Sequence, residues 1–94
     1  MPVDVKQQLQ LIKPVLKEKY HVSKIGIFGS YAREEHTDSS DIDLLVEFSK
    51  PIGLKFVELK YFLEETLGKN VDLVTVNALK PKLKETILNE VVYQ

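Results

Sequence analysis

The sequence predicts an α/β (α+β) fold in which helices flank a small mixed sheet of at least three strands. Two observations lead to this prediction: three short apolar runs rich in β-branched residues, and intervening stretches whose apolar residues recur at helical spacing. Because the two kinds of segment alternate, we expect the order helix, strand, helix, strand, helix, strand, helix. The whole chain, residues 1–94, is expected to form a single domain.

Composition excludes several other classes of protein. The chain has 44% hydrophobic and 29% charged residues, with 13 basic against 14 acidic side chains and a net charge of −1. A near-neutral chain without a basic stripe makes binding to a long nucleic acid unlikely as a function. No apolar run reaches the roughly 18 residues of a membrane span, and the first residues do not resemble a signal peptide. We therefore expect no membrane association and a cytoplasmic location. The absence of cysteine excludes disulfides and thiolate metal ligands.

The first predicted element is a helix near the N-terminus. Its apolar residues are spaced by four, three and four positions, which places them on one face: Val5, Leu9, Ile12 and Leu16. Pro14 lies within this pattern and cannot donate a backbone hydrogen bond, so it must bend the helix or begin a second piece. We expect a bent helix.

The next segment predicts a strand that leads into a phosphate-binding turn. Lys24–Phe28 is a short apolar run that ends at Gly29, and Ser30 occupies the position of an N-cap before Tyr31–Glu35, which we expect to be helical. The first turn of a helix carries unpaired N–H groups and a partial positive charge. Gly29 and Ser30 are therefore candidates for binding phosphate oxygens.

Two acidic residues open the second predicted strand, Asp41–Phe48, and ten residues separate Ser30 from Asp41. Side chains alternate between the faces of a strand, so Asp41 and Asp43 are expected on the same face, about 6.5 to 7 Å apart. Ile42 and the other apolar residues should face the opposite layer. Two carboxylates in this arrangement can share one metal ion.

A third acidic residue lies in the third predicted strand, Asn70–Val76. Asp72 stands there among residues suited to a core, where an unpaired acid is rare. If this strand lies beside the second one, Asp72 completes a three-carboxylate cluster with Asp41 and Asp43. Such a cluster repels itself unless cations neutralise it, and Mg²⁺ suits oxygen ligands in a partly open site.

Two further helices are predicted after the second strand. Residues 54–67 show helical spacing and stop at Gly68, and Lys80–Asn89 begins with Pro81 in its first turn. The residues expected to face the core are Phe56, Leu59, Leu63 and Leu67, with Val57 and Phe62 alongside, and then Leu83, Ile87 and Leu88. Val91–Tyr93 extends the last segment.

Each candidate site residue also has a purely structural interpretation. Gly29 and Ser30 could form only a tight turn with a helix cap, and the acids at 41 and 43 could be a solvated strand entrance. Asp72 could belong to the turn before its strand. Arg33 could contact a phosphate or pair with a neighbouring acid, and the sequence favours neither. The spacing between the turn and the acids favours the functional interpretation of Gly29, Ser30, Asp41 and Asp43.

These residues also carry a family resemblance. Ile25–Arg33 (IGIFGSYAR), followed by Ser39–Val46 (SSDIDLLV) and Asp72, resembles the minimal nucleotidyltransferases (MNT) of the DNA polymerase beta superfamily. The resemblance implies transfer of a nucleotide from ATP with two Mg²⁺ ions. It implies that Asp41 and Asp43 hold both ions, that Asp72 helps to hold the one that activates the acceptor hydroxyl, and that Ser30 binds the distal phosphates.

The resemblance also implies a protein partner. Larger members of the superfamily carry further domains that hold the acceptor, so in this chain the acceptor is expected to supply its own surface. MNT proteins pair with HEPN-domain ribonuclease toxins, which implies an antitoxin that transfers AMP to a tyrosine of the toxin. Two alternatives stay open: an antitoxin that acts by occlusion without catalysis, and a small-molecule (antibiotic) nucleotidyltransferase. A homodimer through exposed apolar residues such as Tyr93 also stays open.

Overall fold

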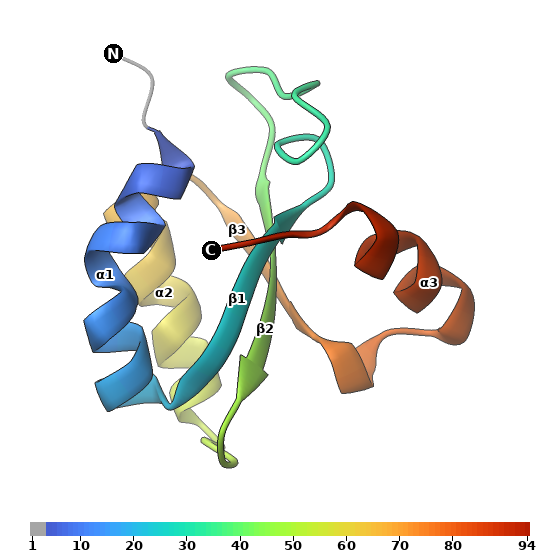
Figure 1. The fold of residues 1–94 in the computed structure, drawn as a ribbon. Helices are drawn as coiled ribbons and strands as arrows, with labels where there is room; N and C mark the ends of the chain where they lie inside the picture. The colour runs from blue at the N-terminus through green and yellow to red at the C-terminus, as the bar shows by residue number, and fades with distance from the viewer. Residues whose placement is uncertain (1–3) are drawn as a thin grey trace.

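A single sheet runs through the computed structural model, which describes residues 4–94, and helices lie on both of its faces (Figure 1). The helices are α1 (Val5–Tyr20), α2 (Lys55–Leu67) and α3 (Pro81–Glu90), with a short 3₁₀ turn, η1 (Val76–Ala78). The strands are β1 (Val22–Phe28), β2 (Ile42–Phe48), β3 (Val71–Thr75) and β4 (Val92–Tyr93), in the order β3-β2-β1-β4. Strand β1 is antiparallel to β2 and β4, whereas β2 and β3 are parallel, which confirms the predicted mixed sheet.

The two faces of the sheet are covered differently. Helices α1 and α2 pack on one face, where alternate residues of β2 such as Ile42 and Leu44 enter the main core. Helix α3 lies on the other face (Figure 1) and packs through Ile87 against Phe28 and Leu45. Odd-numbered positions of β2 therefore face α3, and this alternation decides where the acids of β2 lie.

Helix α1 confirms the predicted apolar face. Val5, Leu9 and Leu16 are buried in the main core, and Ile12 packs against it. The helix is continuous through Pro14, so no second helix begins there. In the part of the chain that the structure describes, no helix has the length and apolar content needed to cross a membrane.

The predicted helix over Tyr31–Glu35 is wrong. The segment makes a single turn, in which the Glu35 N–H donates to the Ser30 carbonyl at 2.8 Å and the Glu34 N–H donates to the Tyr31 carbonyl at 3.4 Å. Glu34 adopts a left-handed conformation with φ of 59°. This pair of hydrogen bonds around a left-handed residue is the Schellman arrangement that ends helices. The turn is therefore closed before a helix can propagate.

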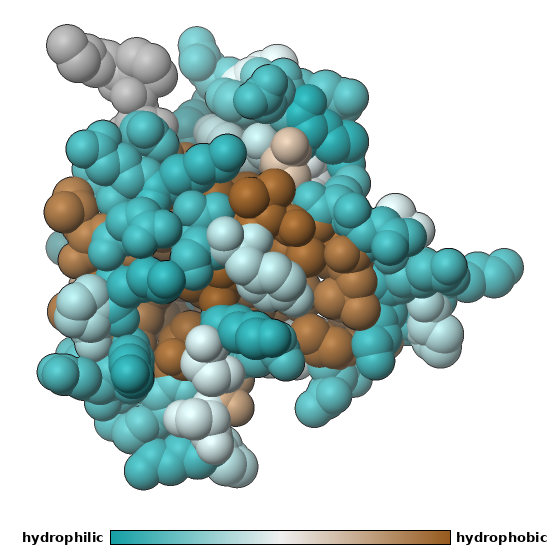
Figure 2. Space-filling model, in the orientation of Figure 1, coloured by the Kyte–Doolittle hydropathy of each residue, from teal (hydrophilic) through white to brown (hydrophobic). Residues whose placement is uncertain are grey.

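Three apolar residues expected in the core are instead on the surface. Leu83 and Leu88 of α3 are 54% and 39% exposed, and Val57 of α2 is 51% exposed. Helix α3 buries only one residue, Ile87, and hydrophobic surface stays exposed where the sheet meets this helix (Figure 2). The last residues form the short strand β4 against β1, an additional strand that the sequence analysis described only as an extension.

The burial of α2 leads to a stability prediction. Replacing the fully buried Leu63 by alanine should lower the free energy of unfolding by about 2–5 kcal/mol, because it leaves a cavity between α2 and the sheet. Replacing the exposed Val57 of the same helix by alanine should change it by less than about 0.5 kcal/mol. Urea unfolding followed by circular dichroism measures both. Equal losses in the two variants would contradict the placement of α2.

Candidate active site

The register of the sheet brings the predicted acids together. Asp43 of β2 and Asp72 of β3 are paired in neighbouring parallel strands, and Asp41 lies two residues before Asp43, directly ahead of β2. The residues on either side of Asp43 in β2, Ile42 and Leu44, face α1 and α2 and belong to the main core. Asp41, Asp43 and Asp72 therefore lie on the α3 side of the sheet, at the end where β2 and β3 begin.

The pKa of Asp43 is affected by the charges of both other acids. Asp43 is half-buried, and this burial raises the pKa of its carboxyl group above the ordinary value. The negative charges of Asp72 and then Asp41 raise this pKa further, while Arg33 acts in the opposite direction. An Asp that is both partly buried and surrounded by like charges is costly to keep ionised, which is a frequent property of functional sites.

The donor set suits a hard divalent cation, but the side chains are not gathered around one point. Among residues 4–94, no three acidic or histidine side chains lie close enough together to make a ready-formed metal site. Asp41 and Asp72 are exposed, whereas Asp43 is half-buried. The three carboxylates fit Mg²⁺, which takes one or two protein carboxylates together with water and phosphate oxygens.

Gly29 forms the turn next to this cluster. It follows Phe28, the residue paired with Asp43 across the β1–β2 ladder, and has a left-handed backbone with φ of 72°. A side chain at position 29 would collide with the Oδ2 atom of Asp43, so only glycine lets the carboxylate approach the turn this closely. The structure therefore places Gly29, and with it the start of the 29–34 turn, directly against the acidic cluster.

Ser30 follows in the same turn. Its predicted role as a helix N-cap is wrong, because no helix forms after it. Its side chain is half-buried, and its hydroxyl makes no hydrogen bond to another group within residues 4–94. Its role as a phosphate ligand stays a prediction, now based on the turn rather than on a helix end.

Glu90 is a site residue that the sequence analysis missed. Its Oε1 atom accepts a hydrogen bond of 2.8 Å from the Gly29 N–H, and its Oε2 atom lies 3.0 Å from Nη1 of Arg33. Arg33 also donates from Nε to Glu35 at 3.2 Å, so it pairs with two acids, one of the alternatives left open above. These contacts raise the pKa of the Arg33 guanidinium further. Glu90 is distant in sequence, at the end of α3, and no local motif marks it.

A polar hollow opens beside Asp41. It has a volume of about 490 Å³ and lies between the end of the β1–β2 loop and the turn after α2. Its lining includes Ser39, Ser40, Asp41, Lys69 and Asn70. Of the three predicted carboxylates, Asp41 alone lines this hollow.

The raised pKa of Asp43 predicts how stability depends on pH. Between the ordinary Asp pKa and the raised one, the folded chain binds more protons than the unfolded chain, so stability falls as pH rises through the raised pKa. In metal-free protein, Asp43→Asn should therefore melt at a higher temperature than wild type at pH 7. The difference should vanish below about pH 3, where the wild-type carboxyl is protonated in both the folded and the unfolded state. Thermal unfolding in EDTA across this range measures it, and a constant difference would contradict the argument.

The fold and the site together define a nucleotidyltransferase. The sequence profile of the nucleotidyltransferase domain family matches residues 9–94, and the chain therefore belongs to this family.

Two relatives cover nearly the whole chain. It is 45% identical over 91 residues to the protein adenylyltransferase MntA of Thermococcus cleftensis, with 96% of this chain and 92% of that protein covered. It is 46% identical over 92 residues to a Methanocaldococcus jannaschii protein that is provisionally named a protein adenylyltransferase, with 96% and 94% covered.

Solved structures share the fold. A structure provisionally described as a minimal nucleotidyltransferase aligns with a TM-score of 0.77 and 34% identity, covering 96% of this chain and 95% of that one. A toxin–antitoxin complex with AMP-PNP aligns with a TM-score of 0.74 at 22% identity, covering 97% and 72%. A complex of a tri-AMPylated Shewanella oneidensis HEPN toxin with its MNT antitoxin aligns with a TM-score of 0.68 at 22% identity, covering 95% and 70%. At this identity the two complexes support the fold alone.

Proposed function

We propose that this nucleotidyltransferase transfers AMP from ATP to a tyrosine hydroxyl of a HEPN-domain toxin, and that it acts in this way as an antitoxin. The observation that carries the proposal is the placement of Asp43 beside Asp72 on one side and against Gly29 on the other. The transfer of an adenylyl group to a protein is proposed because the relatives are named protein adenylyltransferases. A HEPN toxin is proposed as the partner because the Shewanella complex contains an AMPylated HEPN toxin.

Each site residue has a specific task in this proposal. Asp41, Asp43 and Asp72 would hold two Mg²⁺ ions, which when bound neutralise phosphate charge and stabilise the entering and leaving oxygens. Gly29 lets the turn lie directly against the Asp43 carboxylate, and Ser30 would offer its hydroxyl to the distal phosphates. The acceptor oxygen bonds to the α-phosphorus, pyrophosphate leaves, and the hydroxyl proton passes to solvent or to a carboxylate of the cluster. Positioning and charge neutralisation suffice for this chemistry.

The transferred AMP group would explain how the ribonuclease activity of the partner is lost. An AMP moiety adds bulk and a negative phosphate at the modified tyrosine. Near a ribonuclease site, this charge would repel the phosphates of an RNA substrate. The modified toxin would then lose activity without being bound permanently.

The test is direct transfer to a purified partner. We expect the wild-type protein, incubated with Mg²⁺, ATP labelled at the α-phosphate and the HEPN protein encoded beside it, to label that protein. Intact mass spectrometry should show additions of AMP, and a partner with the acceptor tyrosine changed to phenylalanine should stay unlabelled. Absence of label with any of the four nucleoside triphosphates would contradict the proposal. Protection of cells by the Asp41→Asn, Asp43→Asn double variant would instead favour neutralisation by occlusion.

A further inference from the structure

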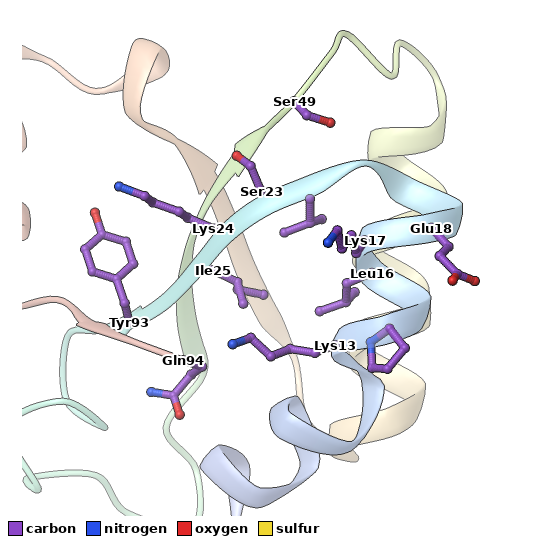
Figure 3. A pocket seen from close by; sticks show the side chains of 12 residues that line it. Lys13, Leu16, Lys17, Glu18, Ser23, Lys24, Ile25, Ser49, Tyr93 and Gln94 are labelled. Atoms are coloured by element: carbon purple, nitrogen blue, oxygen red, sulfur yellow. The ribbon is translucent and has the colours of Figure 1, made fainter.

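A second hollow lies away from the carboxylates, at the opposite end of β1. It has a volume of about 820 Å³ and is lined by the second half of α1, the start of β1 and the last two residues (Figure 3). Figure 3 shows Leu16 of α1 and Ile25 of β1 lying between these elements, and Val22 also lines the hollow. We call this hollow the α1–β1 groove. Its floor is apolar, because these residues belong to the main core.

One wall of the α1–β1 groove is an unpaired sheet edge. Strand β4 pairs only with Gly26 and Ile27 of β1, and the Gln94 N–H adds one hydrogen bond of 2.9 Å to the Ile25 carbonyl. Within residues 4–94, no strand lies beside Val22–Lys24 on that side. A free strand edge next to an apolar hollow is the arrangement that accepts an extended peptide as an additional strand.

The rim of the α1–β1 groove is positively charged. Lys13, Lys17 and Lys24 line it, against a single acid, Glu18. None of these three lysines takes part in an ion pair within the described chain. Lys24 lies over the ring of Tyr93, with Nζ 5.6 Å from the ring centroid, on the side of β1 away from α1 (Figure 3). The chain as a whole has a net charge of −1, so the positive rim is a local feature.

We infer that the α1–β1 groove binds an extended acidic segment of a partner protein, which pairs with Val22–Lys24 as an additional strand. Apolar residues on the face of the segment toward α1 would fill the floor; acidic residues on that face would meet Lys13 and Lys17, and acidic residues on the opposite face would meet Lys24. A second copy of this chain is the less suitable occupant, because edge-to-edge pairing would bring the lysines of both copies together. The inference concerns binding alone and does not depend on the proposed transfer reaction.

A synthetic peptide tests the groove without nucleotide or a natural partner. The probe is a capped seven-residue peptide that alternates valine and glutamate, titrated into ¹⁵N-labelled protein while backbone amide shifts are recorded. We expect saturable shifts that centre on Val22–Ile25 and weaken as salt is raised. A lysine-for-glutamate version of the peptide should bind at least about tenfold more weakly. So should a version with alternate N-methyl amides, because it cannot pair with the edge.

Reversing the charge of two groove lysines in the protein complements the charge changes in the peptide. Lys17→Glu with Lys24→Glu should weaken binding of the glutamate peptide about tenfold and improve binding of the lysine peptide. The control is Lys6→Glu with Lys82→Glu, which makes the same change in net charge at exposed positions outside the groove. Equal binding of the peptides, equal effects of the two double variants, or shifts centred on Asp41 and Asp43 would overturn the inference. The inference would also be overturned if the groove variant left peptide binding unchanged but altered the sedimentation of the protein without peptide. A second copy of the chain would then be the occupant of the groove.

Discussion

Asp43→Asn is expected to lower the rate of nucleotide transfer about a thousandfold while leaving the fold intact. Asp43 lies next to two other parts of the site. It is paired with Asp72 across the β2–β3 ladder, and its Oδ2 atom packs against Gly29. The amide keeps the shape of the side chain but removes the charge that a metal–triphosphate complex requires. Initial rates with labelled nucleotide and the protein acceptor measure this loss.

The control for this variant is Glu65→Gln, which removes one charge from an exposed position of α2. It should transfer nucleotide at the wild-type rate. The circular dichroism of both variants should match that of wild type, since the Asp43 carboxylate is a source of repulsion rather than of stability. Retention of more than about a tenth of the activity by Asp43→Asn would show that the charge of Asp43 is not essential.

The placement of the acids was predictable because it follows from strand periodicity. Asp41 and Asp43 are separated by two positions, so they share a face in any strand that includes them. The sequence left one condition open, namely whether the strand of Asp72 lies beside that of Asp43. The observed parallel pairing of β2 with β3 meets this condition. Helix α2 was also predictable from the sequence, since Gly68 ends it in a left-handed conformation.

The failures have a common physical origin in contacts between distant parts of the chain. Adequate helix formers at 31–35 predicted a helix, but a left-handed Glu34 closes the turn after one round of hydrogen bonds. Glu90 reaches the Gly29 N–H only because α3 crosses the second face of the sheet and β4 returns along β1. The inward face assigned to Leu83 and Leu88 assumed a broad helix contact, whereas only Ile87 is buried. Periodicity describes one element at a time and cannot reveal such contacts.

Gly29→Ala is expected to damage both the stability and the activity of the protein. The left-handed backbone at Gly29 costs an alanine roughly 1–2 kcal/mol by itself. The added Cβ would also meet the Asp43 carboxylate, so either the turn or the acid must move. Displacement of Asp43 from the turn should lower nucleotide transfer by about a hundredfold, because small misplacements of catalytic groups are costly. Chemical unfolding and transfer rates measure the two effects.

Gly53→Ala separates the two causes. Gly53 also has a left-handed backbone, with φ of 56°, but nothing lies within 4 Å of a Cβ built there. This variant should lose only the conformational cost of roughly 1–2 kcal/mol and should keep full transfer activity. Gly29→Ala should cost more than Gly53→Ala in the wild-type background. In the Asp43→Ala background its cost should fall to the Gly53→Ala value, because the obstructing carboxylate is gone. Equal costs in both backgrounds would show that Gly29 and Asp43 are not coupled, and the contact between the turn and the acidic cluster would lose its role in building the site.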